Sequence, residues 1–141
     1  LTYGNQKDYI ITEIKKHLAD RAFIYRILNN FLPIEDLAAL RLITDIFISL
    51  PLSDQLSRTL KENIYAGNMV ITGSWLPYKI LEQQGADYYK IDRLEQLPRL
   101  LNNIIKNQEK YQVDKRKNKE IIEKDSLWSE KIKEWAALYE F

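Results

Sequence analysis

Short apolar runs alternate with longer amphipathic segments over most of the chain. The runs at residues 46–50, 69–72 and 87–91 have the length and composition of buried strands. Residues 22–28 alternate more loosely and are also predicted to form a strand, and residues 1–3 have the pattern of a strand end. These runs predict a sheet built from short strands.

The segments between the runs place apolar residues at helical spacing. They predict helices at residues 8–19, 34–44, 53–66, 76–84 and 94–107. The third begins with Ser53 or Asp54 as its N-cap and is stopped by Gly67 and Asn68.

A strand, a helix and a second strand with short connections form a βαβ unit, whose strands run parallel. The alternation therefore predicts an α/β fold, namely a Rossmann-like three-layer domain with a parallel sheet over residues 1–107. Residues 108–141 lack strand patterns and are predicted to form C-terminal helices that pack on this domain or on a missing partner domain. Ser126 is expected to cap the last helix, which carries an apolar face that includes Trp128 and Trp135.

Composition narrows the chemistry that the chain can perform. It has 141 residues and a net charge of +1, so one domain is expected and there is no overall attraction to nucleic acid. The absence of cysteine excludes disulfides, thiolate zinc sites and cysteine nucleophiles. With His17 as the single histidine, a metal site or a histidine-based triad is not expected. The chain begins at Leu1 rather than Met, so we expect a fragment of a longer protein.

The candidate chemistry lies around the predicted helix 53–66, because ligands of open parallel sheets bind beyond the carboxyl ends of the strands. Asp54 and Glu62 are separated by seven residues, which places them on a broad helix face about 12 Å apart. An N-cap and a solvated glutamate would give the same spacing. Ser57, Arg58 and Thr59 in the first turn could cradle a diphosphate, or Arg58 could be an ordinary exposed side chain.

Gly4 offers a weaker phosphate site, because it joins a predicted strand end to a helix N-terminus. An ordinary tight turn would have the same sequence.

The segment from Asp45 to Pro77 resembles the nucleotide-sugar-binding C-terminal domain of glycosyltransferases of the GT-B fold. Residues 45–51 resemble the family's strand, Asp54 to Glu62 resembles its E-x7-E motif, and residues 62–71 resemble the run that follows. Residues 31–37 resemble the segment that precedes the strand. Two departures stand out: Asp54 is one methylene shorter than glutamate, and the basic pair that neutralises the diphosphate upstream has no counterpart.

The resemblance implies a role for each matched residue. Glu62 would hold the ribose hydroxyls, and Asp54 would approach the donor sugar as the predicted catalytic residue, which positions the donor. The helix start at Ser57, Arg58 and Thr59 would face the diphosphate. The nucleotide base would be lined by Phe31 and Leu32.

As a whole, the resemblance implies the donor-binding half of a transferase, mostly of the retaining class, that moves a sugar from a nucleotide-diphosphate sugar to a glycan or lipid-linked acceptor. No cofactor and no metal are expected. The acceptor would bind a missing N-terminal domain, so this chain alone is expected to be inactive. The expected location is cytoplasmic, with the inner face of the membrane as a peripheral alternative.

Two other functions fit parts of the sequence. A non-catalytic α/β interaction module would use the helix that carries Trp128 and Trp135 as its docking surface. A nucleic-acid binder would use the basic cluster at residues 115–119, but acids at Asp114, Glu120 and Glu123 dilute it. No nucleic-acid partner is therefore expected.

Overall fold

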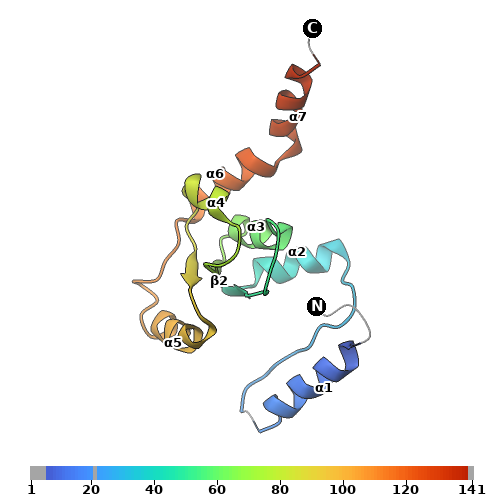
Figure 1. Ribbon diagram of the computed structural model, residues 1–141, viewed down its shortest axis with the longest axis vertical. Helices are drawn as coiled ribbons and strands as arrows, with labels where there is room; N and C mark the ends of the chain where they lie inside the picture. The colour runs from blue at the N-terminus through green and yellow to red at the C-terminus, as the bar shows by residue number, and fades with distance from the viewer. Residues whose placement is uncertain (1–5, 21, 140–141) are drawn as a thin grey trace. The chain divides into compact units, whose positions relative to one another are not determined.

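The computed structural model of the protein describes residues 6–20 and 22–139 (Figure 1). The chain forms two compact units, Leu1–Asp36 and Leu37–Phe141, which are treated separately below.

The described part of the first unit contains helix α1, Lys7–Leu18, and the start of helix α2, Ile34–Leu42. The predicted strand at residues 22–28 does not form, which corrects the sequence prediction. A strand needs a neighbour to satisfy its backbone hydrogen bonds, and the described residues of this unit form no strand. The predicted strand end at residues 1–3 lies outside the described residues.

The second unit alternates strands and helices. In chain order its elements after α2 are β1 Ile46–Ser49, α3 Arg58–Tyr65, β2 Met69–Gly73, α4 Lys79–Gln83, β3 Tyr89–Ile91, a 3-10 turn Leu94–Gln96, α5 Leu97–Lys106, α6 Lys115–Ser126 and α7 Trp128–Ala137. The strands predicted at residues 46–50, 69–72 and 87–91 are confirmed, each within two residues at either end.

The strands form a parallel sheet in the order β1-β2-β3, with β2 in the centre. Successive strand residues point to opposite faces, so Val70 and Ile71 contribute to different cores. Val70 packs with residues of α3, α4 and α6, whereas Ile71 packs with Ile104 and other residues of α5. Helices therefore cover both faces of the sheet, and the α/β prediction is confirmed.

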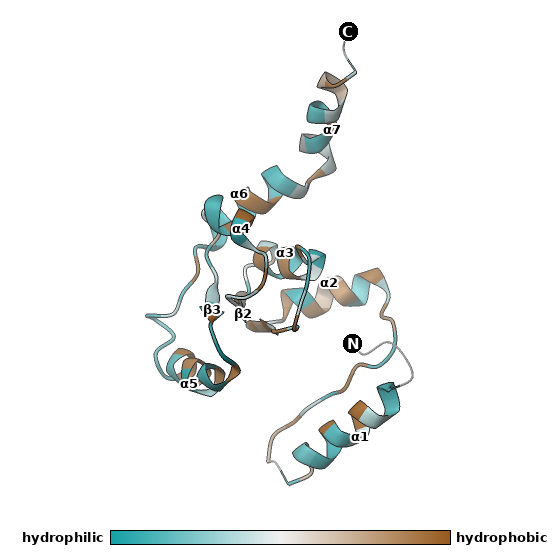
Figure 2. Ribbon diagram, viewed as in Figure 1, coloured by the Kyte–Doolittle hydropathy of each residue, from teal (hydrophilic) through white to brown (hydrophobic). Residues whose placement is uncertain are grey.

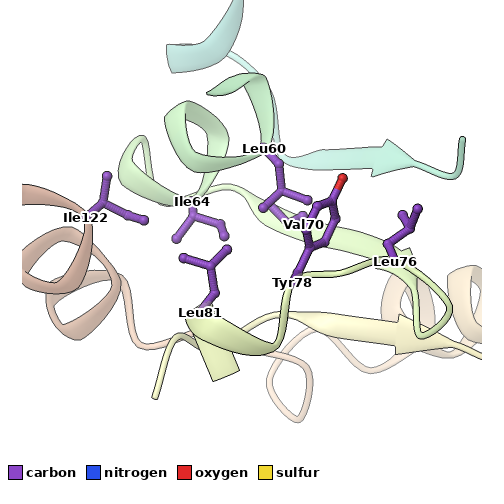
Figure 3. Close-up of a cluster of buried hydrophobic side chains, with 7 residues drawn as sticks. All are labelled: Leu60, Ile64, Val70, Leu76, Tyr78, Leu81 and Ile122. Atoms are coloured by element: carbon purple, nitrogen blue, oxygen red, sulfur yellow. The ribbon is translucent and has the colours of Figure 1, made fainter. Parts of the chain in front are cut away.

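Figure 3 shows the larger of the two cores. Its buried members come from α3, β2, the segment leading into α4, α4 itself and α6: Leu60, Ile64, Val70, Leu76, Tyr78, Leu81 and Ile122. Ile122 is far from the others in sequence, yet its side chain points toward Ile64 and Leu81 (Figure 3). Helix α6 is thus part of the layer that covers this face of the sheet.

A buried asparagine ties the start of α6 to the segment before β3. The Asn118 side chain accepts a hydrogen bond from the Asp87 backbone N–H at 2.7 Å and donates one to the Asp87 carbonyl at 2.8 Å. Asn118 is fully buried although it lies within the basic cluster at residues 115–119. Figure 2 shows α6 as a mostly hydrophilic (teal) helix with a short hydrophobic (brown) stretch. The two hydrogen bonds of Asn118 help this polar helix to pack against the sheet.

The far end of α6 is held to α3 by an ion pair. Lys61 Nζ lies 2.5 Å from Asp125 Oδ2, and Gln84 also donates to the Asp125 carboxylate. Burial by itself would raise the pKa of Asp125, but the hydrogen bonds from Lys61 and Gln84 hold it below its ordinary value. The carboxylate is therefore the favoured form in the folded chain.

Ser126 does not cap the last helix, which corrects a second prediction. It is the final residue of α6, and Leu127 adopts an extended conformation that separates α6 from α7. The Ser126 hydroxyl instead hydrogen-bonds Asp125 and accepts from Lys61. The apolar side chains of α7 remain largely exposed, including Trp128, Ile132 and Trp135.

Replacing Asn118 with alanine should lower the free energy of unfolding by roughly 2 kcal/mol or more, because both backbone groups of Asp87 lose their partner. Urea unfolding measures the change. The control is Asn102→Ala, which removes an exposed asparagine from α5. Equal losses in the two variants would contradict the assigned role of Asn118.

Replacing Asp125 with asparagine should remove a pH-dependent part of the stability. Because the folded-state pKa lies below the ordinary value of 3.8, the carboxylate stabilises the fold above that value. This contribution disappears as the pH falls through the folded-state pKa. We expect wild type to exceed Asp125→Asn by roughly 1 kcal/mol at neutral pH in urea unfolding, and the gap to close in acid. A gap that stays constant down to acid pH would refute the assignment.

Candidate functional site

The carboxyl ends of the strands meet at one edge of the sheet, where β1 leads to Pro51, β2 to Ser74 and β3 to Asp92. The Ser74 hydroxyl donates a 2.6 Å hydrogen bond to Asp92 Oδ1, which links the ends of β2 and β3. The Ser74 N–H donates to the carbonyl of Ile91, so backbone pairing with β3 continues one residue past the end of β2. This edge is therefore ordered by side chains as well as by the sheet.

Trp75 closes the same edge between β1 and β2. Its indole N–H donates a 2.9 Å hydrogen bond to the carbonyl of Pro51. The ring lies so close to Gly73 that a Cβ built there would be 2.4 Å from the indole carbons, which only a residue without a side chain permits. About 40% of Trp75 remains exposed, so one part of the ring faces outward beside the strand ends.

Helix α3 follows β1 and begins near this edge, but later than predicted. Ser57, with an extended backbone, is its N-cap and accepts a hydrogen bond from the Leu60 N–H at 3.4 Å. Ser53 and Asp54 therefore lie in the preceding loop, and the helix-face argument for Asp54 is wrong. Arg58 and Thr59 are exposed residues of the first turn, which itself contains no acidic residue.

Asp54 is held by a side chain that the sequence argument did not consider. The hydroxyl of Tyr78 donates a 2.6 Å hydrogen bond to Asp54 Oδ2. Burial raises the pKa of Tyr78 far above its ordinary value, and the hydrogen bond and charge of Asp54 add to the increase. Tyr78 belongs to the larger core, and its hydroxyl points away from the other labelled side chains (Figure 3). The contact anchors the loop before α3 to that core.

Glu62 lies between two arginines. Its Oε1 accepts a 2.9 Å hydrogen bond from Nε of Arg58, one helical turn earlier, and its Oε2 lies 2.5 Å from Nη2 of Arg41. Arg41 comes from the end of α2, within the second unit. The two cations and one carboxylate leave one positive charge in this cluster, which we call the Arg41–Arg58–Glu62 cluster.

A buried amide pair fixes the backbone beneath this cluster. Asn68 Nδ2 donates to the carbonyl of Arg41 at 2.9 Å and to Asn63 Oδ1 at 2.7 Å. Asn63 in turn donates to the carbonyl of Thr59. Asn68 therefore connects the end of α2 with α3, so the positions of Arg41 and Glu62 depend on the same polar contacts.

Phe31 and Leu32 belong to the first unit, and Gly4 lies outside the described residues. No group of three or more potential metal-ligating side chains gathers among the residues that the structure describes. None of the helices in the described ranges combines the length and apolar composition needed to cross a membrane.

An open groove of about 910 Å³ lies at the opposite edge of the sheet. Its walls come from the starts of β1 and β2, the end of α5 and the segment that leads into α6. The groove lies at the amino ends of the strands, whereas the first turn of α3 follows the carboxyl end of β1. It does not contain the predicted site residues.

Sequence reasoning missed Tyr78 and Arg41, which contact the two acids of the motif. The i,i+4 spacing of Arg58 and Glu62 is visible in the sequence. Arg41 is not at a helical spacing from Glu62, so only the packing of α2 near α3 reveals its contact. Comparisons with protein-family models, curated proteins and solved structures found no match to the chain.

Replacing Gly73 with alanine should displace the Trp75 ring and lower the free energy of unfolding by about 1–3 kcal/mol, as overpacking does elsewhere. A double-mutant cycle with Trp75→Ala, measured by urea unfolding, tests the cause. In the Trp75→Ala background the same glycine substitution should cost much less. Equal costs in the two backgrounds would show that the ring is not the obstacle.

Proposed function

We propose that the chain binds a nucleotide-diphosphate sugar and is the donor-binding half of a glycosyltransferase. The observation that carries the proposal is the parallel β1-α3-β2 unit, in which an acid-free helix start follows the carboxyl end of β1. Helix N-termini at this position favour phosphate groups through their free N–H groups and dipole. Asp54 precedes this helix start and Glu62 follows it, as in the motif that the sequence resembles.

Each residue would act mainly by positioning the donor. Ser57, Arg58 and Thr59 would face the diphosphate, and Arg58 would offset the charge that develops on the leaving group. Glu62 would accept hydrogen bonds from the ribose hydroxyls. Asp54 would approach the sugar from the loop, where its hydrogen bond to Tyr78 limits its motion.

The remaining parts of the reaction would come from outside the second unit. Phe31 and Leu32 are the proposed contacts to the base, and a glycan or lipid-linked acceptor would bind a further domain. Sugar transfer would occur in the cytoplasm or at the inner face of the membrane.

A protein-interaction module is the second candidate, and the exposed apolar side chains of α7 favour it. Trp128 and Trp135 are 68% and 53% exposed, which is unusual for such large apolar residues. A module of this kind would bind a protein through α7 and have no affinity for nucleotides. Nucleotide binding therefore separates the two candidates.

The proposal predicts ribose recognition by Glu62. UDP, GDP, TDP and CMP are first compared by thermal shift, and calorimetry then measures the affinity of the best ligand and of its 2′,3′-dideoxy form. We expect wild type to favour the form with ribose hydroxyls by about 1–3 kcal/mol, as charge-assisted hydrogen bonds do. In Glu62→Ala this preference should disappear.

Glu120→Ala is the matched control, because Glu120 also lies four residues after an arginine on a helix. It should retain the preference for ribose hydroxyls. A Glu62→Ala variant that still prefers the nucleotide over its 2′,3′-dideoxy form would show that Glu62 does not bind the ribose hydroxyls. If no nucleotide binds, the interaction module becomes the better proposal.

A further inference from the structure

The Arg41–Arg58–Glu62 cluster has an arrangement that an ordinary surface ion pair lacks. Two guanidinium groups from different helices contact the two oxygens of one carboxylate. The side chain of Arg58 is 86% exposed, so most of its guanidinium faces solvent. The side chain of Arg41 is only 19% exposed. The cluster thus combines one solvent-facing cation with one that is mostly covered.

Arg41 is also incompletely satisfied. Its Nε is buried and has no hydrogen-bond partner among the described residues, although Nη2 contacts Glu62. A buried donor without a partner is costly, and arginine normally satisfies its planar set of donors with paired acceptors. The single carboxylate of Glu62 therefore satisfies fewer of the guanidinium donors of the two arginines than an anion with more acceptor oxygens would.

The charge around the cluster favours a second anion. Two arginines and one glutamate leave a net charge of +1, and Arg58 is also the first residue of α3, whose N-terminus carries partial positive charge. The first turn of α3 contains no acid. A phosphate group supplies several acceptor oxygens and forms strong paired contacts with arginine.

We infer that Arg41 and Arg58 form a phosphate-binding pair that Glu62 occupies as an internal anion when no ligand is bound. A phosphate group of the ligand takes the place of the Glu62 carboxylate on the two guanidinium groups. The displaced carboxylate is then free to accept hydrogen bonds from hydroxyl groups of the same ligand. The inference rests on the proposed function for the identity of that ligand, and it adds Arg41 to the site.

The pair can be tested with inorganic pyrophosphate, which carries no base, ribose or sugar. Calorimetry at one low salt concentration compares wild type with Glu62→Gln, Arg58→Gln and Arg41→Gln. Removing the internal anion should strengthen pyrophosphate binding by Glu62→Gln about tenfold. Removing either arginine should weaken it by about tenfold or more, because each contributes charge-assisted hydrogen bonds.

Arg116 and Glu120 provide matched controls on α6, since they form the same residue pair at the same i,i+4 spacing. Arg116→Gln and Glu120→Gln change the net charge equally and should leave pyrophosphate affinity unchanged. Arg58 is exposed, so Arg58→Gln keeps the test valid even where Arg41→Gln lowers stability. Thermal unfolding of each variant shows which ones remain folded.

A Glu62→Gln variant that binds pyrophosphate no better than wild type, or not at all, would overturn the inference. Equal losses in Arg58→Gln and Arg116→Gln would also overturn it, because they would indicate attraction by net charge alone. Failure of the proposed function alone is distinguishable. Pyrophosphate affinity would then still fall in the arginine variants, while no nucleotide would show a preference for ribose hydroxyls. If Glu62 is needed for the preference for ribose hydroxyls but the arginine variants bind pyrophosphate as wild type does, the proposed function is retained and this inference is wrong.

Discussion

The central strand β2 is the constraint on which the second unit depends. It has a parallel neighbour on each side, and Val70, Ile71 and Thr72 are fully buried. A strand buried on both faces requires a helical layer on each, because parallel sheets expose little of either face to water. Helix α5 supplies one layer, and α3, α4 and α6 supply the other. Since α6 follows β3 in the chain, this layer is complete only when the C-terminal part of the sequence has docked.

Polar contacts decide how these layers fit together. Asn118 fixes the start of α6, the Lys61–Asp125 pair fixes its end, and Asn68 joins α2 to α3. Each partner is partly or fully buried, so each contact has a preferred geometry in addition to its energy. The apolar cores provide most of the driving force, whereas these contacts select the orientation of each helix. The position of Arg41 beside Glu62 follows from this arrangement.

The proposed site links stability with function. Both acids of the motif have partners within the chain: Asp54 contacts Tyr78, and Glu62 contacts Arg41 and Arg58. The contact of Asp54 anchors a loop to the core, which suits a positioning role. The contacts of Glu62 join exposed or partly covered side chains, whose rearrangement would leave the sheet unchanged. A nucleotide ligand would therefore rearrange the contacts of Glu62, while the Asp54–Tyr78 hydrogen bond keeps the loop in place.

The sequence by itself determined the parallel α/β character of residues 46–91, because apolar runs of strand length alternate there with amphipathic helices and turn residues. The i,i+4 spacing of Arg58 and Glu62 is also present in the sequence, but their contact was not predicted from it. The sequence-based prediction misjudged residues 22–28, since strand propensity has no effect without a neighbouring strand, and it placed the cap of α3 at Ser53 or Asp54, whereas the structure has Ser57 there. Only the tertiary structure decided the partners Tyr78–Asp54 and Arg41–Glu62, because each joins elements whose approach is set by packing rather than by spacing along the chain.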